Sequence, residues 1–362
     1  MKKFVYLIVF PLLLACSGGG SGGDDSPQPD KVTSLQIYLS DTTTIVGQSL
    51  IFSVIDNTGQ TRTSEAKFFV NDVEIQGSKY TFNEIGKFQV HATFQGISSQ
   101  RKEVTVNPVP IEYKKRVMVE DYTGTWCGWC PRVSYALELL EKETDDAVIV
   151  AAHQGDPMQF SQISALMSAF SVSGFPTAII NREQKWTSPQ PNNVAQVTAK
   201  LAQKAYIGLA INPTIDGRNL YINTKMSIGY NYNVLKLGVY IIEDDLEYDQ
   251  QNYTSYYNGA AVLRGFKHHN VLRASLTNIL GDQLPNDEVG HGKDYEKTFN
   301  YSIPAQYNKE NIKVVVFVTE GSSKVVLNSR VAEIGETQEI EKKEWKKLLT
   351  CTEWVMKKLW LW

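Results

Sequence analysis

The segment Thr125-Trp126-Cys127-Gly128-Trp129-Cys130-Pro131 constrains this chain more than any other, because it places two thiols only two residues apart. It follows the apolar run Val117-Met118-Val119 and precedes a stretch with apolar residues at helical spacing. A second motif, Gly174-Phe175-Pro176-Thr177, comes directly before the apolar segment 178–180. Together the two motifs predict a dithiol at a strand-to-helix turn and a proline that opens a later strand.

A dithiol in this position suits thiol–disulfide exchange. A thiol at a helix N-terminus has its pKa lowered by the helix dipole and by free main-chain N–H groups. We therefore expect Cys127 to be the exposed, attacking thiol and Cys130, about one turn later, to be the buried resolving thiol. Zinc usually takes four ligands and no second CxxC is present, while a structural disulfide across so short a loop would constrain the unfolded chain little. Redox chemistry is favoured over both alternatives, and no metal is expected.

The stretch from Val117 to Ala205 resembles the thioredoxin superfamily, with its order of strand, CxxC, helix, strand, helix and proline. In that family the proline is cis and lies against the dithiol, and the residue before it pairs with the substrate main chain. The resemblance assigns these roles to Pro176 and Phe175. Trp126 belongs to the intact motif, and Trp129, between the cysteines, is expected to contact substrate. The pair Gly128-Trp129 leaves the redox direction open.

The same resemblance implies a buried proton acceptor six residues before the first cysteine, which is Asp121. Strand alternation puts Asp121 on the same face as Val117 and Val119, which agrees with an inward carboxyl. Glu120 is the alternative if the strand is bulged. His153 ends the next predicted strand, where it either lies near the dithiol or simply closes the strand.

The first residues predict export and a lipid anchor. Residues 1–15 join a short basic start to an apolar run, which matches a secretory signal and is too short to span a bilayer comfortably. The end, Leu13-Leu14-Ala15-Cys16, resembles a bacterial lipobox, in which Cys16 would carry the lipid; the alternative is a plain signal with an incidental cysteine. Residues 16–30 predict a flexible polar tether. The expected location is the cell envelope, as an outer-membrane lipoprotein facing either the periplasm or the cell surface.

Cysteine usage and charge exclude several other classes of protein. Of the four cysteines, one is the expected lipid site, two form the CxxC, and Cys351 has no evident partner. Without a framework of structural disulfides, the 362 residues must fold around two or three ordinary cores. The net charge is −3 with the charges interspersed, so nothing points to nucleic acid.

Three globular blocks are expected after the tether. Residues 31–107 show short alternating strands between turn signals, and they resemble bacterial immunoglobulin-like domains. Residues 111–205 form the expected thioredoxin-like domain, and residues 206–335 return to strand patterning. The predicted fold class is therefore multidomain: an N-terminal immunoglobulin-like β-sandwich, a central thioredoxin-like α/β domain and a C-terminal antiparallel β-domain.

Two further segments carry open alternatives. The tyrosine-rich stretch 248–294 is long for a loop within a β-domain, and it is either a binding surface or a packing element. The basic, tryptophan-rich tail 336–362 is either an amphipathic helix or an extension without a function.

The chain as a whole resembles the Omp28-related outer-membrane lipoproteins of Bacteroidota over residues 111–335. The resemblance rests on the lipobox, the immunoglobulin-like module, Glu120-Asp121-Tyr122-Thr123-Gly124 and His269-Asn270-Val271-Leu272-Arg273. The expected function is a membrane-anchored thiol–disulfide oxidoreductase or isomerase that acts on exported proteins, with a membrane or periplasmic redox partner and no cofactor. The alternative is a surface binding or adhesion lipoprotein that uses a thioredoxin-like scaffold without redox turnover.

Overall fold

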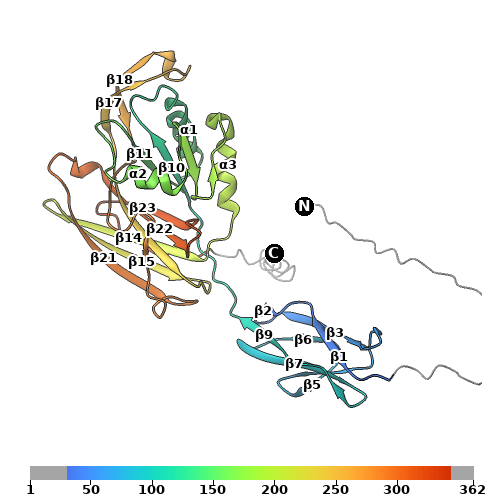
Figure 1. The fold of residues 1–362 in the computed structure, drawn as a ribbon. Helices are drawn as coiled ribbons and strands as arrows, with labels where there is room; N and C mark the ends of the chain where they lie inside the picture. Colours follow the sequence, from blue (N-terminus) through green and yellow to red (C-terminus); the bar gives the residue numbers. More distant parts are fainter. Residues whose placement is uncertain (1–30, 344–362) are drawn as a thin grey trace, which may run out of the picture. The chain divides into compact units, whose positions relative to one another are not determined.

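The computed structural model describes residues 31–343, which belong to two compact units divided after Asn107 (Figure 1). The predicted signal, the tether with Cys16, and Cys351 lie outside the described residues. Within residues 31–343 no helix is long and apolar enough to cross a membrane.

The first unit consists of two β-sheets around one apolar core. Alternation builds this core: in the strand Ser49–Asp56, Leu50, Phe52 and Val54 are buried and the residues between them are more exposed. One sheet has the order β1-β3-β6; the other has the order β2-β9-β7-β4-β5, with β8 paired to β7. The strands are β1 (Leu35–Leu39), β2 (Thr43–Ile45), β3 (Ser49–Asp56), β4 (Lys67–Val70), β5 (Val73–Ile75), β6 (Lys79–Thr81), β7 (Gly86–Phe94), β8 (Ile97–Ser98) and β9 (Lys102–Asn107).

The second unit is built mainly of strands with three short α-helices. The strands are β10 (Val117–Thr123), β11 (Ala147–His153), β12 (Thr177–Ile180), β13 (Gln184–Lys185), β14 (Ile207–Asp216), β15 (Asn219–Ile228), β16 (Leu235–Glu243), β17 (Leu246–Gln251), β18 (Val262–His268), β19 (Val271–Ser275), β20 (Asp282–Gln283), β21 (Asp294–Ser302), β22 (Ile312–Glu320) and β23 (Val326–Glu333). The helices are α1 (Pro131–Glu143), α2 (Ile163–Ala169), α3 (Val194–Thr198) and the 3₁₀ turns η1 (Gln190–Asn193), η2 (Ala199–Ala202), η3 (Tyr257–Gly259) and η4 (Lys309–Asn311).

One nine-stranded mixed sheet runs through this second unit. Its order is β13-β12-β10-β11-β19-β16-β22-β23, with β20 paired to β16. β11 is parallel to β10 on one side and to β19 on the other, where Ala151 pairs with Val271. A three-stranded sheet, β14-β15-β21, and the two-stranded hairpin β17–β18 complete the unit (Figure 1).

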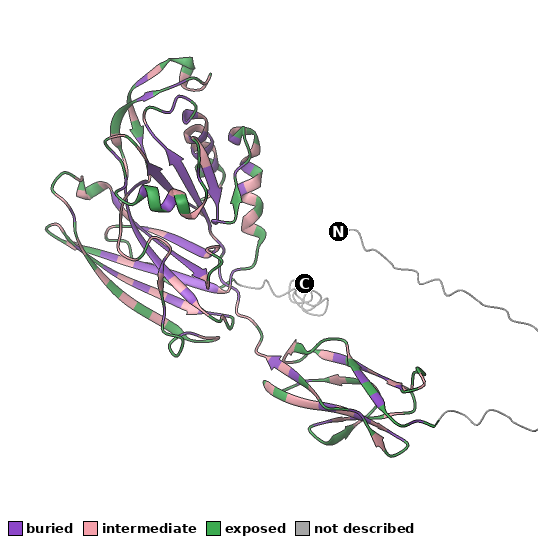
Figure 2. Cartoon of the chain, in the orientation of Figure 1, coloured by how far each residue is buried: buried purple, intermediate pink, exposed green. Residues whose placement is uncertain are grey.

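The central strand β10 is buried along its whole length (Figure 2). Its Val117 and Val119 pack against α1 and α3. Met118 and Tyr122 point to the opposite face and belong to a core shared with α2, β16 and β22. A third core lies between β14-β15-β21 and the other face of β16 and β22.

The predicted fold class is wrong. We expected a separate thioredoxin-like α/β domain followed by a separate antiparallel β-domain, behind an immunoglobulin-like sandwich. Instead, the segment with the CxxC forms no α/β domain of its own, because β19 pairs with β11 and joins its strands to β16, β22 and β23. The core that holds Met118 also holds Phe317, so the two expected domains share one hydrophobic interior. The chain is a mostly β protein with several sheets in two compact units.

The beginning of the predicted tail packs against the second unit. The side chain of Gln338 is buried and accepts a hydrogen bond from the Ile211 N–H at 3.1 Å. Glu341 pairs with Arg116 at 2.6 Å. Residues 344–362 of this tail lie outside the described residues.

Candidate functional site

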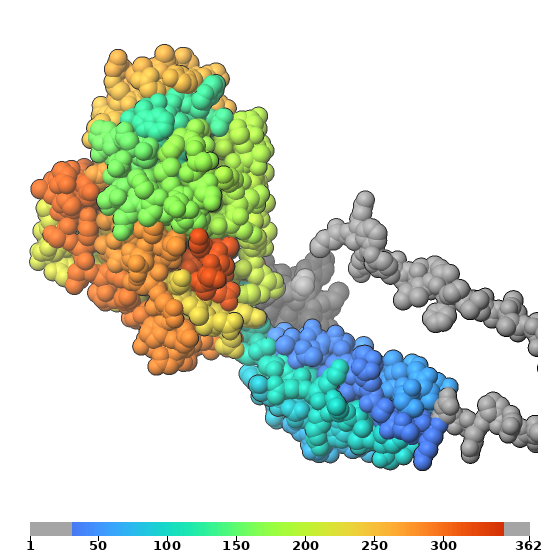
Figure 3. All heavy atoms as spheres, viewed as in Figure 1, coloured from blue at the N-terminus to red at the C-terminus, as the bar shows by residue number. Residues whose placement is uncertain are grey.

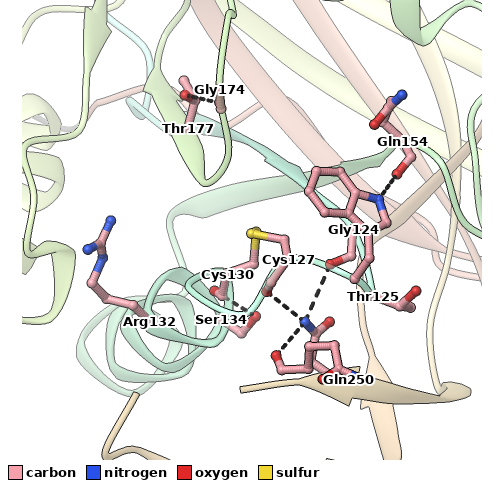
Figure 4. Close-up of a disulfide and its surroundings, with 12 residues drawn as sticks. Gly124, Thr125, Cys127, Cys130, Arg132, Ser134, Gln154, Gly174, Thr177 and Gln250 are labelled. Atoms are coloured by element: carbon pink, nitrogen blue, oxygen red, sulfur yellow. Dashed lines mark hydrogen bonds between the residues drawn. A yellow bond between two sulfur atoms is a disulfide. The ribbon is translucent and has the colours of Figure 1, made fainter. Parts of the chain in front are cut away.

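A disulfide joins Cys127 to Cys130 at the turn between β10 and α1 (Figure 4). Cys130 is the N-cap of α1, and Pro131 follows at the first helical position, where a missing N–H costs nothing. Cys127 is 5% exposed and Cys130 is 1% exposed, so the surroundings almost cover both residues. We expected Cys127 to be exposed and Cys130 to be buried, but the two residues differ little in exposure.

The predicted tryptophan and proline motifs come together beside this disulfide. The Trp126 indole N–H donates to the Gln154 carbonyl at 2.7 Å, and its ring meets the edge of Phe175 with centroids 5.3 Å apart. The Phe175–Pro176 peptide bond is cis. A Cβ on Gly124 would lie 2.7 Å from the Trp126 Nε1, so a side chain at that position would displace the indole.

The β17–β18 hairpin, which comes from the tyrosine-rich stretch, is hydrogen-bonded to the CxxC turn. The Gln251 N–H donates to the Thr125 carbonyl at 2.9 Å, and the Tyr253 N–H donates to the Gly128 carbonyl at 2.7 Å. The side-chain amide of Gln250 is buried and donates to the Cys127 carbonyl at 3.0 Å (Figure 4). Figure 3 shows the hairpin, in orange, directly against the teal residues of this turn.

Tyrosines near the tip of the hairpin extend this contact onto α1. Tyr256 stacks on Tyr135 with centroids 4.5 Å apart, and the Tyr257 hydroxyl lies 2.7 Å from Glu138. The Tyr253 ring lies over Gly128, where an added Cβ would come within 2.4 Å of it. Trp129 meets Tyr253 edge-on at 6.1 Å. The stretch 248–294 was expected to be either a binding surface or a packing element. Tyr256 and Tyr257 pack against α1, as the second interpretation requires, whereas Tyr253 is 63% exposed.

Asp121 lies on the face of β10 that carries Val117 and Val119. It is 2% exposed, and its Oδ1 has no hydrogen-bond partner among the described residues. Burial raises the pKa of Asp121 to about 8. It lines a cavity of about 60 Å³ together with Ser134 of α1, whose hydroxyl is 3.5 Å from the Cys130 carbonyl. This volume is enough to hold water.

Glu120, the alternative proton acceptor, is already paired. Strand β10 keeps its regular register with β11 and β12, so Glu120 points away from Asp121. Both of its oxygens accept from Arg182, at 2.7 and 3.0 Å, inside the core. The guanidinium also donates to the Tyr240 hydroxyl at 2.7 Å. Of the two candidate proton acceptors, Asp121 is therefore the one whose carboxyl has an oxygen without a partner.

His153 ends β11 and lines the same cavity as Asp121. Its Nδ1 is 2.6 Å from Asp156 Oδ2, and this oxygen also accepts from the Thr125 N–H at 2.9 Å. Burial is the largest single effect on Asp156 and opposes its ionisation. The hydrogen bond and charge of His153, together with the N–H donors of Thr125 and Met158, outweigh burial and lower the pKa of Asp156. His268, from β18, meets the His153 ring edge-on at 5.2 Å. Burial lowers the pKa of His268 to about 4.

Sequence reasoning missed the contribution of the hairpin. The tyrosines at 253, 256 and 257 were a visible signal, but Gln250 and His268 carried none. In the described part of the chain, no group of three or more His, Cys, Asp or Glu side chains is arranged to hold a metal.

Fold and site together define a mostly β protein that carries a CxxC disulfide. Residues 163–338 match the family model for outer membrane protein Omp28. This part of the chain is thus similar to an outer-membrane protein family, and the similarity confirms the expected location in the cell envelope. The matched stretch begins after the CxxC, and nothing in it supports the expected thioredoxin-like domain. Lipid attachment at Cys16 stays a prediction.

Solved structures give weaker likenesses. HBP35 of Porphyromonas gingivalis is 17% identical, with 64% of this chain and 79% of that chain covered and a TM-score of 0.49. A domain of the outer membrane lipoprotein Omp28 from Porphyromonas gingivalis is 19% identical, with 37% and 92% covered and a TM-score of 0.25. Neither likeness is close enough to carry an argument about function. No curated protein sequence matches the chain.

Proposed function

We propose that the Cys127–Cys130 pair exchanges disulfides with the cysteines of exported proteins, while the chain is anchored in the outer membrane through Cys16. The observation that carries this proposal is the closed disulfide at the N-terminus of α1, on the same side of β10 as the unpaired carboxyl of Asp121. Its helix-terminal position stabilises a thiolate, which is the species that leaves and attacks in exchange.

The exchange balances with the groups at hand and a substrate dithiol. A substrate thiolate attacks the Cys127 sulfur, the Cys127–Cys130 bond breaks, and Cys130 leaves as a thiolate with the electron pair. A second substrate thiolate then attacks the substrate sulfur of the mixed disulfide and releases Cys127. The substrate dithiol is oxidised and the CxxC is reduced. A redox partner that carries a disulfide restores the closed pair, and a dithiol partner drives the reverse reaction.

Each of the other expected site residues has a place in this scheme. A protonated Asp121 supplies a proton toward Cys130 through the cavity that it shares with Ser134, and a pKa of about 8 keeps that proton available near neutral pH. Pro176 and Phe175 lie on the loop beside Trp126 and position the substrate main chain. Trp129 contacts the substrate from the opposite flank.

Trapping of a mixed disulfide tests this proposal. The full chain carries Cys351→Ser to remove the tail thiol, in combination with either Cys127→Ser or Cys130→Ser. The substrate is a peptide whose single cysteine is held in a disulfide with glutathione. In the Cys130→Ser variant the Cys127 thiolate should attack this disulfide, release glutathione as the thiolate and accumulate a mixed disulfide with the peptide, whereas the Cys127→Ser variant should accumulate far less. Equal trapping by both variants, or by neither, contradicts the assigned order of attack.

The second candidate function is a binding or adhesion lipoprotein without redox turnover. The near-complete burial of both cysteines and the hydrogen bonds from the hairpin favour it. The two candidates differ in the response to glutathione buffers. An exchanging site equilibrates and gives a defined potential, whereas a structural disulfide stays closed across the same buffers.

A further inference from the structure

Four aromatic side chains border the disulfide, and they form two edge-to-face pairs. Trp126 and Phe175 make one pair at 5.3 Å, and Trp129 and Tyr253 make the other at 6.1 Å. Trp126, Trp129 and Tyr253 remain 47%, 52% and 63% exposed. We name the four residues the aromatic rim.

Hydrogen bonds and packing hold the aromatic rim in place. The Trp126 indole is fixed to the Gln154 carbonyl, and the Tyr253 main chain is fixed to the Gly128 carbonyl. Gly128 leaves room for the Tyr253 ring. Large aromatic side chains that are already ordered lose little entropy on binding, and they can bury much apolar area.

We infer that the aromatic rim binds extended, apolar segments of unfolded polypeptide on either side of the cysteine that reacts. The exchange step rests on the proposed function, but the binding step does not. Isolated exposed aromatics are ordinary on a protein surface, whereas here they gather around one reactive group. Because both cysteines are at most 5% exposed, a narrow, extended chain reaches the Cys127 sulfur more readily than a folded surface does. The four side chains carry no charge, so the rim offers an acidic or basic segment no ionic partner.

Competition between two peptides tests the inference. Both carry a single cysteine; in one it is flanked by Phe and Leu, and in the other by Ser and Gly. We expect the full chain to react about tenfold faster with the apolar peptide, a difference of about 1.4 kcal/mol, which is the scale of one or two aromatic contacts. Tyr253→Ser should remove most of this preference, measured as the ratio of the rates with the two peptides in the same variant. Tyr221→Ser, at a tyrosine 42% exposed on β15 of a different sheet, is the matched control and should keep the preference.

A second measurement separates binding from chemistry. The same peptides with serine in place of cysteine are titrated against the oxidised protein, and tryptophan fluorescence reports binding. Tighter binding of the apolar peptide, weakened several-fold by Tyr253→Ser but not by Tyr221→Ser, supports the inference even where no exchange occurs; in that case only the proposed function fails. Equal binding of both peptides, or equal loss in both tyrosine variants, overturns the inference.

Discussion

The side-chain amide of Gln250 donates to the main-chain carbonyl of Cys127 at 3.0 Å, across 123 residues of sequence. The same amide nitrogen lies 2.9 Å from the Gln251 carbonyl and 3.4 Å from the Gly124 carbonyl. The Cys127 carbonyl also accepts from the Cys130 N–H at 3.1 Å, so the Gln250 amide is the second of these two donors and couples the hairpin to the CxxC turn. The geometry of the disulfide turn is thus set partly by a residue distant in the sequence.

Replacing Gln250 with leucine should loosen this coupling. The variant removes the Gln250 donor from the Cys127 carbonyl, which keeps the Cys130 N–H, and we expect a loss of about 0.5–1.5 kcal/mol in the free energy of unfolding, measured in urea. Gln203→Leu, at an exposed glutamine, is the matched control and should change stability by less than about 0.5 kcal/mol. Equal effects of the two substitutions would show that the Gln250 amide does not hold the turn.

Gly128 should tolerate no side chain while Tyr253 lies over it. A Cβ at Gly128 would meet the Tyr253 ring at 2.4–2.5 Å, so Gly128→Ala should displace the hairpin and cost about 1–3 kcal/mol. In a Tyr253→Ala background the same substitution should cost much less. Gly174→Ala, with nothing within 4 Å of the added Cβ, serves as the control. Urea unfolding of wild type, Gly128→Ala, Tyr253→Ala and the double variant gives the coupling energy between these two residues. A coupling energy of zero would contradict the contact between Gly128 and the Tyr253 ring.

The local parts of this architecture could be predicted from the sequence. The CxxC turn with its helix is a short-range feature, and the strand at 219–228 follows from alternation of apolar and polar residues. The strand at 235–243 is a short, mainly apolar run, and the cis form of the Phe175–Pro176 bond was expected only from the resemblance. Pairing between distant strands has no such local pattern. Nothing in Val271-Leu272-Arg273 tells that β19 pairs with β11, and this single pairing merges the two expected domains into one unit.

The residues of the candidate site likewise divide into those that a local pattern predicts and those whose contacts form only in the folded chain. Asp121 was expected from the resemblance, which implies a buried acid six residues before the first cysteine, and strand alternation agrees with the way its side chain points. Glu120, its neighbour, pairs with Arg182, which lies 62 residues away and occupies a positive-φ turn after β12. Gln250 is an ordinary polar residue in a polar segment, so only the folded hairpin reveals its contact with the Cys127 carbonyl.

The buried Glu120–Arg182 pair should be essential to the second unit. Arg182→Leu leaves the Glu120 charge without its partner in the core and removes one donor from the Tyr240 hydroxyl, which still donates to the Ile279 carbonyl, and we expect a loss of about 3–5 kcal/mol. The double variant Glu120→Leu with Arg182→Leu should be more stable than either single variant, since it buries no lone charge. Arg264→Leu, which breaks the exposed pair with Asp249, should cost less than about 1 kcal/mol. Additive losses in the double variant would contradict a coupled buried pair.

The raised pKa of Asp121 should make the folded protein less stable as the pH rises. Burial raises this pKa to about 8, against about 3.9 in an unfolded chain. Between these values the folded state binds a proton that the unfolded state has released, so this contribution to stability is present below about pH 4 and is lost as the pH approaches 8. The slope is at most about 1.4 kcal/mol per pH unit. Asp121→Asn removes the titrating group, so its free energy of unfolding should increase relative to that of wild type as the pH rises from 4 to 8. Urea unfolding across this range measures the difference. Asp287→Asn, at an exposed carboxyl, should follow the wild-type curve. Parallel curves for wild type and Asp121→Asn would mean that Asp121 is ionised in the folded protein throughout this range, and it could then not donate the proton that the proposed exchange requires.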